Sequence, residues 1–253
     1  MLLIGVVFVA AFTGRTSSTH HRHTRLAKAG HRPWDSADVM MEMMRLQAAY
    51  SSVDHLSFDI TFNLSVAVAG ITYPSTQTGH YKVNGNKYYI KFDSTEQMQD
   101  SLYHIVVAND QQLVTLQRPN YFFVTIMQMD VMDTLFQQTS VQGMTAIDSG
   151  SMRKISFQFY HESMIKSMNI VYDTGTYRLR TIYGTMTTQS TLAADSASGV
   201  ATSITENMQF LNYQNGAFGD TVFNMRKYFT KQQDSFVFVH PYETYTFVNS
   251  TLD

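Results

Sequence analysis

The chain has 253 residues, of which 44% are hydrophobic and 13% aromatic, enough to bury the core of one large β-rich domain. Its formal net charge of -2, from 18 basic and 20 acidic side chains, gives no positive field to attract nucleic acid. The absence of cysteine excludes disulfides, thiolate metal sites and cysteine nucleophiles.

An uncharged apolar run opens the chain. Residues 2–12, LLIGVVFVAAF, are 11 in number, about half of what a membrane-spanning helix needs. The run predicts a signal peptide over residues 1–11, although no Lys or Arg precedes it. A buried N-terminal strand is the alternative. No later stretch reaches the roughly 18 apolar residues of a spanning helix, so we expect an exported, for example periplasmic, protein that does not span a membrane.

Residues 12–33 are basic and rich in histidine, with few apolar side chains. This composition predicts a flexible leader. Clustered histidines capture Zn²⁺ adventitiously, but a dedicated site needs a rigid frame and supporting carboxylates. We therefore expect no metal and no cofactor, and a single ordered domain over residues 34–253.

The first predicted element of this domain is a helix. Asp35 or Ser36 can cap it, and its apolar residues recur at helical spacing. These are Val39, Met40, Met43, Leu46 and Tyr50. The segment also holds four of the 16 methionines, Met40, Met41, Met43 and Met44. Flexible thioethers suit a surface that adapts to variable apolar shapes, and ordinary core packing is the alternative.

Residues 55–68, HLSFDITFNLSVAV, alternate between apolar and polar side chains. The apolar positions are Leu56, Phe58, Ile60, Phe62, Leu64, Val66 and Val68. Because successive side chains of a strand point to opposite faces, this pattern predicts a long strand with one apolar face.

Strand patterns return through the rest of the chain. We expect strands at residues 79–83, 87–92, 101–108, 112–117, 155–159, 168–172, 177–183 and 204–213, and one or two closing strands near the end. Residues 70–75 predict a turn, and Asn84-Gly85-Asn86 is a strong hairpin signal. A second helix is expected to start near Asp130. The Ser, Thr and Ala-rich residues 187–203 predict a long exposed loop.

One segment resembles a catalytic motif. Residues 173–176, Asp-Thr-Gly-Thr, match the triplet of aspartic proteases, which need two such loops facing each other. Only one copy exists, and the same residues are typical of a turn. No other catalytic motif is present, and no spacing supports a triad around His104, His161 or His240. We expect no enzyme; a pocket in which His104, His161 or Asp173 converge would indicate one.

Four segments together resemble a known family. They are LQAAYSSVDHLSFDITFNLSV, GHYKVNGNKYYIKF, VVANDQQLVTLQRP and MNIVYDTGTYRLRTIYG, within residues 38–248. Their order is similar to that in the periplasmic lipoprotein-carrier superfamily, the LolA and LolB type. The chain departs from that pattern at Gln111, where Gly is common, and at Lys87, where Arg is usual. The resemblance implies an α+β, mainly antiparallel β fold: a curved, incomplete β-barrel covered by short helices, with a cavity for acyl chains.

The alternating strands and this resemblance predict an exported, non-enzymatic carrier of lipid or of the acyl chains of lipoproteins. The candidate cavity residues are Phe58, Ile60, Phe62, Tyr88, Ile90, Phe92, Phe157 and Phe159. Ordinary core packing is the alternative at each. By family analogy, Lys87 would meet a head group or an acyl carbonyl; an exposed strand-end lysine is the alternative. The rival hypothesis is an envelope structural or interaction module with a filled barrel, which binds partner proteins through aromatics such as Tyr121, Phe122 and Phe123.

Overall fold

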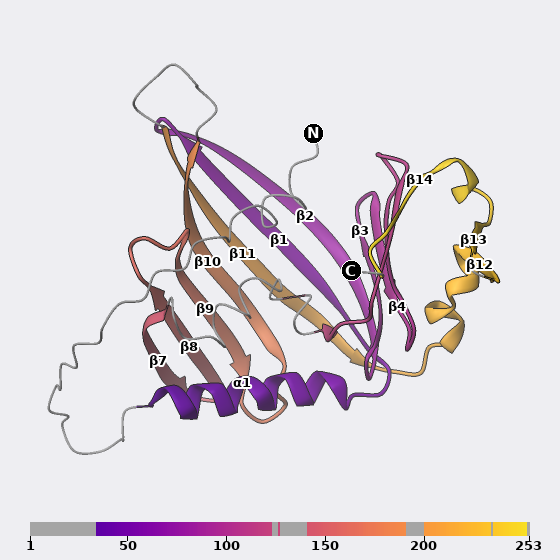
Figure 1. The fold of residues 1–253 in the computed structure, drawn as a ribbon. Helices are drawn as coiled ribbons and strands as arrows, with labels where there is room; N and C mark the ends of the chain where they lie inside the picture. The colour runs from indigo at the N-terminus through magenta and orange to yellow at the C-terminus, as the bar shows by residue number, and fades with distance from the viewer. Residues whose placement is uncertain (1–33, 123–125, 127–140, 191–199, 234, 252–253) are drawn as a thin grey trace, which may run out of the picture.

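The computed structural model describes residues 34–122, 126, 141–190, 200–233 and 235–251. They form one large twisted sheet, one α-helix and a small hairpin (Figure 1). The predicted signal peptide, the leader and the helix near Asp130 lie outside the described residues. Within these ranges, no helix combines the length and hydrophobicity needed to cross a bilayer.

Helix α1 (Ser36–Ser51) crosses one end of the sheet (Figure 1). A reciprocal capping box starts it: Asp35 Oδ1 accepts from the Asp38 N–H at 2.9 Å, and Asp38 Oδ2 from the Asp35 N–H at 3.1 Å. The predicted apolar face is confirmed, because Val39, Met43, Leu46 and Tyr50 are buried. Met41 and Met44 are exposed, so these two methionines face away from the sheet.

Twelve strands build the large sheet. They are β1 (Leu56–Val68), β2 (Ile71–Asn84), β3 (Lys87–Phe92), β4 (Thr95–Gln99), β5 (His104–Ala108), β6 (Leu113–Gln117), β7 (Val141–Ser149), β8 (Met152–Phe159), β9 (Ile165–Asp173), β10 (Leu179–Ser190), β11 (Val200–Asn215) and β14 (Thr246–Asn249). Their order is β14-β6-β5-β4-β3-β2-β1-β11-β10-β9-β8-β7.

The sheet is mainly antiparallel, as predicted, and it is open where an incomplete barrel was expected. Among the described strands, only the β14–β6 pair is parallel, and β14 and β7 form the two edges. The expectation of several covering helices is not met in the described part of the chain, where α1 is the one α-helix. Its polar anchors, described below, hold this one helix across several strands.

The predicted long strand is confirmed as β1, but the turn expected at residues 70–75 is wrong. The chain reverses at Ala69 and Gly70, both with positive φ (51° and 81°), and β2 starts at once at Ile71. Pro74 lies within β2. It is tolerated because β3 pairs only with residues 79–84 of β2, so the first half of β2 lies at an open edge.

Other strand limits also differ from the sequence patterns. Strands β4 and β7 were not predicted, and β5 starts three residues later than expected, after a turn. The loop expected at residues 187–203 is wrong at both ends, because β10 continues to Ser190 and β11 begins at Val200. Long cross-strand pairing supports these threonine-rich ends, whose simple composition hides the alternation.

Two cores lie on opposite faces of the sheet. The first lies between α1 and the sheet. The second lies behind β4, β5 and β6, where Met98, Ile105, Val107, Val114 and Leu116 are fully buried. The C-terminal segment covers it with η1 (Asp220–Phe223), η2 (Met225–Lys227), β12 (Phe229–Gln232), β13 (Ser235–Phe238) and η3 (Tyr242–Thr244) (Figure 1).

Candidate functional site

The eight apolar candidates share the face of the sheet that meets α1. Cross-strand pairing links Phe58 to Tyr81 and Tyr81 to Ile90, and it links Ile60 to Gly79 and Gly79 to Phe92. The pairing also runs from Leu64 through Glu206, Gly184 and Met168 to Phe157. Phe92 is partly exposed, and the other candidates are buried. The structure therefore brings together side chains from β1, β3 and β8.

Close to α1, these side chains fill the space between helix and sheet. The Phe58 ring stacks on Tyr81 with centroids 5.2 Å apart, and Phe122 packs against it at 6.1 Å. Phe122 is thus a core residue, while Tyr121 is exposed and Phe123 lies outside the described residues. This end of the face is a packed aromatic core.

Further along the strands, a glycine makes room for an aromatic ring. A Cβ at Gly79 would collide with the ring of Phe92, which lies directly opposite on β3. Phe92 in turn meets Phe62 edge to face at 6.4 Å. The ring of Phe92 thus lies over the backbone of β2, where a larger residue would displace it.

The apolar row of β1 continues beyond this core. We call Leu64, Val66, Val68, Ile71 and Tyr73 the distal stripe; they share the helix-facing face of the β1–β2 hairpin. The three β1 residues are half-buried, whereas Ile71 is 59% and Tyr73 57% exposed. Figure 1 shows this end of the hairpin far from α1. Large apolar side chains therefore remain accessible to water at the far end of the same face.

Among the residues that the structure describes, one carboxyl group lies beside the distal stripe. Glu206 pairs with Leu64 on one side and Gly184 on the other, and its same-face neighbours along β11 are Ile204 and Met208. It has no hydrogen bond or ion pair within the described part of the chain. Burial among these groups raises the pKa of Glu206 to about 7. Near neutral pH the group can therefore donate a hydrogen bond when protonated or accept one when ionised.

Two polar anchors fix α1 on the sheet, the first at Glu42. This carboxylate is 1% exposed. Its Oε1 accepts from Arg153 Nη1 of β8 at 2.7 Å and from the Tyr172 hydroxyl of β9 at 2.6 Å, and its Oε2 accepts from Arg45 at 2.9 Å. Burial, and then the bond to Glu42, raise the pKa of Tyr172. Arg153 also bonds Asp148 at 2.6 Å, which holds the pKa of the guanidinium above its usual value.

The second anchor is Tyr50, near the end of α1. Its hydroxyl oxygen accepts from the Leu179 N–H of β10 at 3.0 Å and lies 2.7 Å from the hydroxyl of Tyr213 on β11. Tyr213 donates to the Leu179 carbonyl at 2.9 Å. Burial raises the pKa of Tyr50 to about 12. The helix that covers the core is thus tied to β8, β9, β10 and β11.

Four other polar candidates, Lys87, Asp173, His161 and His240, do not join this face. Lys87 lies on the other face of β3, with its Nζ 3.9 Å from Asp220 Oδ2. The turn reading of residues 173–176 is confirmed: Asp173 Oδ1 accepts from the N–H groups of Gly175 and Thr176, which helps hold the pKa of Asp173 below its usual value. His161 and His240 are exposed beside Glu162 and Glu243.

His104 is buried in β5 on the helix-facing side of the sheet, with its ring centroid 5.6 Å from that of Tyr88. Neither ring nitrogen has a hydrogen-bond partner, although Gln117 lies opposite on β6. Burial lowers the pKa of His104 to about 4. Six strands separate β5 from β9, which ends at Asp173. The described residues contain no group of His, Asp and Glu side chains arranged to hold a metal.

Glu42, Tyr172 and Glu206 are not among the candidate residues predicted from the sequence. Glu42 has a detectable signal, because it falls between Val39 and Leu46 on the apolar face of a helical pattern. Glu206 has one too, since it occupies an apolar position of the alternation between Ile204 and Met208. A charged residue in an apolar position of a periodic pattern indicates a specific role.

Comparisons with known proteins found similar structures but no similar sequences. Neither a protein-family model nor a curated protein matches the chain. An uncharacterized conserved protein from Thermus thermophilus is 6% identical, with 83% of this chain and 98% of that one covered and a TM-score of 0.40. An outer membrane lipoprotein-sorting domain from Vibrio parahaemolyticus is 8% identical, with 76% and 98% covered and a TM-score of 0.35. A LolA superfamily protein from Nitrosomonas europaea is 7% identical, with 72% and 97% covered and a TM-score of 0.29. One of these similar structures is thus of a protein from the superfamily that the sequence resembles.

Proposed function

We propose that this protein is an exported, non-enzymatic carrier that holds an acyl chain of a lipid or lipoprotein against the helix-facing side of its sheet. The observation that carries the proposal is the distal stripe. Its apolar residues continue the buried row of Phe58, Ile60 and Phe62 but stay half-buried or exposed. If the apolar side chains of β1 served only to fill the core under α1, we would expect the apolar alternation to stop where that core ends.

The dimensions of the stripe suit an extended apolar ligand. A strand rises about 3.3 Å per residue, so the β1 part of the stripe, from Leu64 to Val68, is roughly 13 Å long. Each methylene removed from water contributes about 0.8 kcal/mol. An acyl chain along this row would therefore bind without any charged contact.

Glu206 gives this surface an ionisable group. A carboxyl group among apolar side chains retains a proton more readily than one in water. We propose that it meets an ester or amide of the cargo near one end of the acyl chain. A free fatty acid would place a second carboxyl group nearby, so an uncharged head group is favoured.

The test compares two neighbouring positions on β1. Val66→Asp places a charge in the distal stripe, whereas Ala67→Asp places the same charge on the opposite face of the same strand. Wild type and both variants are purified, checked for folding by circular dichroism and examined by native mass spectrometry for bound lipid. Each is then titrated with a fluorescent fatty-acyl ester.

We expect stoichiometric lipid, or saturable probe binding, in wild type and Ala67→Asp, and at least tenfold weaker binding in Val66→Asp. Folded wild-type protein that carries no lipid and does not bind the probe would overturn the proposal. An interaction module of the cell envelope would then be the better hypothesis. Equal loss in both variants would also contradict it, because the effect would not depend on the face.

A further inference from the structure

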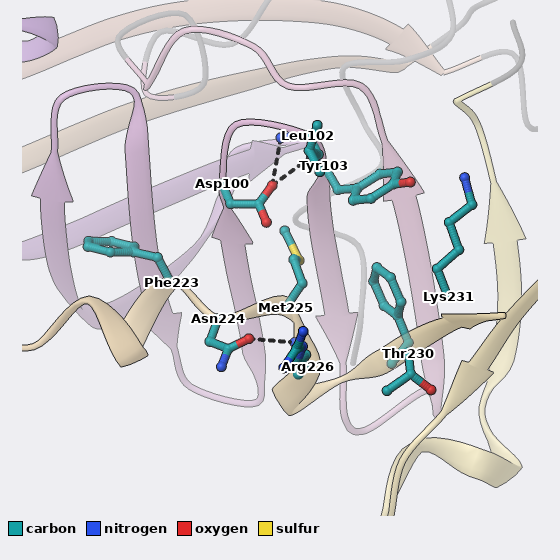
Figure 2. A pocket seen from close by; sticks show the side chains of 10 residues that line it. Asp100, Leu102, Tyr103, Phe223, Asn224, Met225, Arg226, Thr230 and Lys231 are labelled. Atoms are coloured by element: carbon teal, nitrogen blue, oxygen red, sulfur yellow. Dashed lines mark hydrogen bonds between the residues drawn. The ribbon is translucent and has the colours of Figure 1, made fainter.

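A separate pocket lies on the side of the sheet away from α1. It has a volume of about 560 Å³, within the range of small-molecule sites. It lies between the β4–β5 connection and the segment from η1 to β12 (Figure 2). Its lining residues are Asp100, Leu102, Tyr103, Phe223, Asn224, Met225, Arg226, Phe229, Thr230 and Lys231.

The interior of this pocket is apolar and aromatic. Phe223, Met225 and Phe229 are buried, and the rings of Tyr103 and Phe229 meet edge to face at 5.8 Å. Leu102 is 68% exposed at the pocket, a large apolar side chain that a ligand could cover. These walls favour a ligand with an aromatic ring, since rings pack well edge to face.

Two cations line the same pocket. Arg226 and Lys231 are exposed, and neither side chain has an ion pair in the part of the chain that the structure describes. The adjacent Lys227, in contrast, is paired with Glu96 at 2.6 Å. Arg226 and Lys231 thus remain available to a ligand.

The one acidic group of the lining does not neutralise both cations. Asp100 Oδ1 accepts from the N–H groups of Leu102 and Tyr103 at 2.7 and 2.9 Å, which fixes it in the β4–β5 turn. Figure 2 shows Asp100 at this turn and Arg226 on η2, with the Met225 side chain between them. Two positive groups and one negative group leave the lining with a net charge of +1.

We propose that this pocket binds a small organic anion with an aromatic body. Its carboxylate or sulfonate group meets Arg226 or Lys231, which lie at different parts of the lining, and its rings pack against Tyr103, Phe229 and Leu102. Arginine and lysine both bind such oxyanions, and the apolar walls supply the remaining contact area. The site does not rest on the proposed carrier function, because it lies on the other face of the sheet.

The test uses two probes that differ in one charged group. The full chain is titrated by fluorescence with 1-anilinonaphthalene-8-sulfonate and with N-phenyl-1-naphthylamine, which has the same rings without the sulfonate. The variant is Arg226→Gln with Lys231→Gln. The control is Lys91→Gln with Lys154→Gln, which changes the net charge equally at two strand positions outside the pocket.

We expect the Arg226 and Lys231 double variant to bind the sulfonate at least tenfold more weakly and the neutral probe within twofold of wild type. The control variant should bind both probes like wild type. Leu102→Asp, a change at an exposed position, should also weaken sulfonate binding. Unchanged sulfonate binding in the double variant, or an equal loss in the control, would overturn the proposal.

The same titration on Val66→Asp separates this site from the carrier function. That variant should retain saturable sulfonate binding that Arg226→Gln with Lys231→Gln removes. If the acyl ester does not bind to wild type but the sulfonate does, the carrier proposal fails and this one stands. If all sulfonate binding is lost in Val66→Asp, the probe occupies the distal stripe and the present proposal fails.

Discussion

The Glu42 carboxylate on α1 and the Arg153 guanidinium on β8 lie 2.7 Å apart, although 111 residues separate them in the chain. Removing one partner of a buried pair costs about 3–5 kcal/mol, because the other is left uncompensated. Glu42→Gln keeps the shape, and Arg153 keeps Asp148. We therefore expect a loss of about 2–4 kcal/mol in the free energy of unfolding, measured with urea. Arg45→Gln, at the exposed partner, should cost below about 1 kcal/mol; similar losses in both variants would refute the anchor role of Glu42.

Tyr50→Phe tests the second anchor. The variant leaves the buried Leu179 N–H without its acceptor and removes one of the two partners of the Tyr213 hydroxyl, which keeps its bond to the Leu179 carbonyl. We expect a loss of about 1–3 kcal/mol in unfolding free energy. Tyr73→Phe is the matched control, since Tyr73 is exposed, and its effect should stay within about 0.5 kcal/mol. No loss in Tyr50→Phe would show that water replaces the hydroxyl.

Glu206 predicts a loss of stability as the pH rises. Its folded pKa of about 7 lies above the ordinary value of 4.5, so between these pH values the folded state binds more protons than the unfolded state. The stability that this group contributes is present below pH 4.5 and is lost as the pH rises to about 7. We expect Glu206→Gln to raise the unfolding free energy by about 2–3 kcal/mol at pH 8 and to leave it unchanged at pH 4. A stabilisation that does not vary with pH would contradict the raised pKa.

His104 predicts a loss of stability as the pH falls, over a pH range that overlaps with the range for Glu206. Its folded pKa of about 4 lies below the ordinary value of 6.5, so the unfolded state binds the proton first as the pH falls. Stability is lost from pH 6.5 downward, by up to about 3 kcal/mol. His104→Leu should remove this loss, seen as a smaller difference between unfolding at pH 7 and pH 5. Because the two trends offset each other in wild type, each is measured against its own single variant.

Gly79→Ala tests the contact between β2 and Phe92. The added methyl group occupies the place of the Phe92 ring, so the ring must move away from β2. Overpacking of this kind costs about 1–3 kcal/mol. Gly143→Ala on β7, where an added Cβ meets nothing within 4 Å, should be near neutral. Equal melting temperatures of Gly79→Ala and wild type would show that the ring adapts at no cost.

The sequence predicts the elements whose patterns are complete. The alternation from Leu56 to Val68 and the capping signals at Asp35 each identify an element by themselves. Strand β7 could not be found in this way, because it is an edge strand whose side chains are mostly exposed and follow no alternation. Strand β4, TEQMQ, is too polar to be recognised without its neighbours.

The sequence could predict which face of the strand holds the candidate site residues, but not how deeply each side chain is buried. Alternation places Phe58 and Val66 on one face of β1, yet Phe58 is enclosed by other rings and Val66 is half-buried. This difference depends on α1 and on strands far away in the chain. The partners of the two anchors on the sheet could likewise not be predicted, because Glu42 and Tyr50 bond to strand residues more than a hundred positions later.

The pairing of β1 with β11 also has a consequence for folding. It joins residues from Val68 with Thr202 to Leu56 with Asn215, so the middle of the sheet closes a very long loop. Such non-local pairing is slow, because the entropy of loop closure opposes it before the contacts form. During synthesis, β1 has no partner on this side until nearly the whole chain has emerged. The long apolar row of β1 therefore stays without this partner in the nascent chain until β11 has been made.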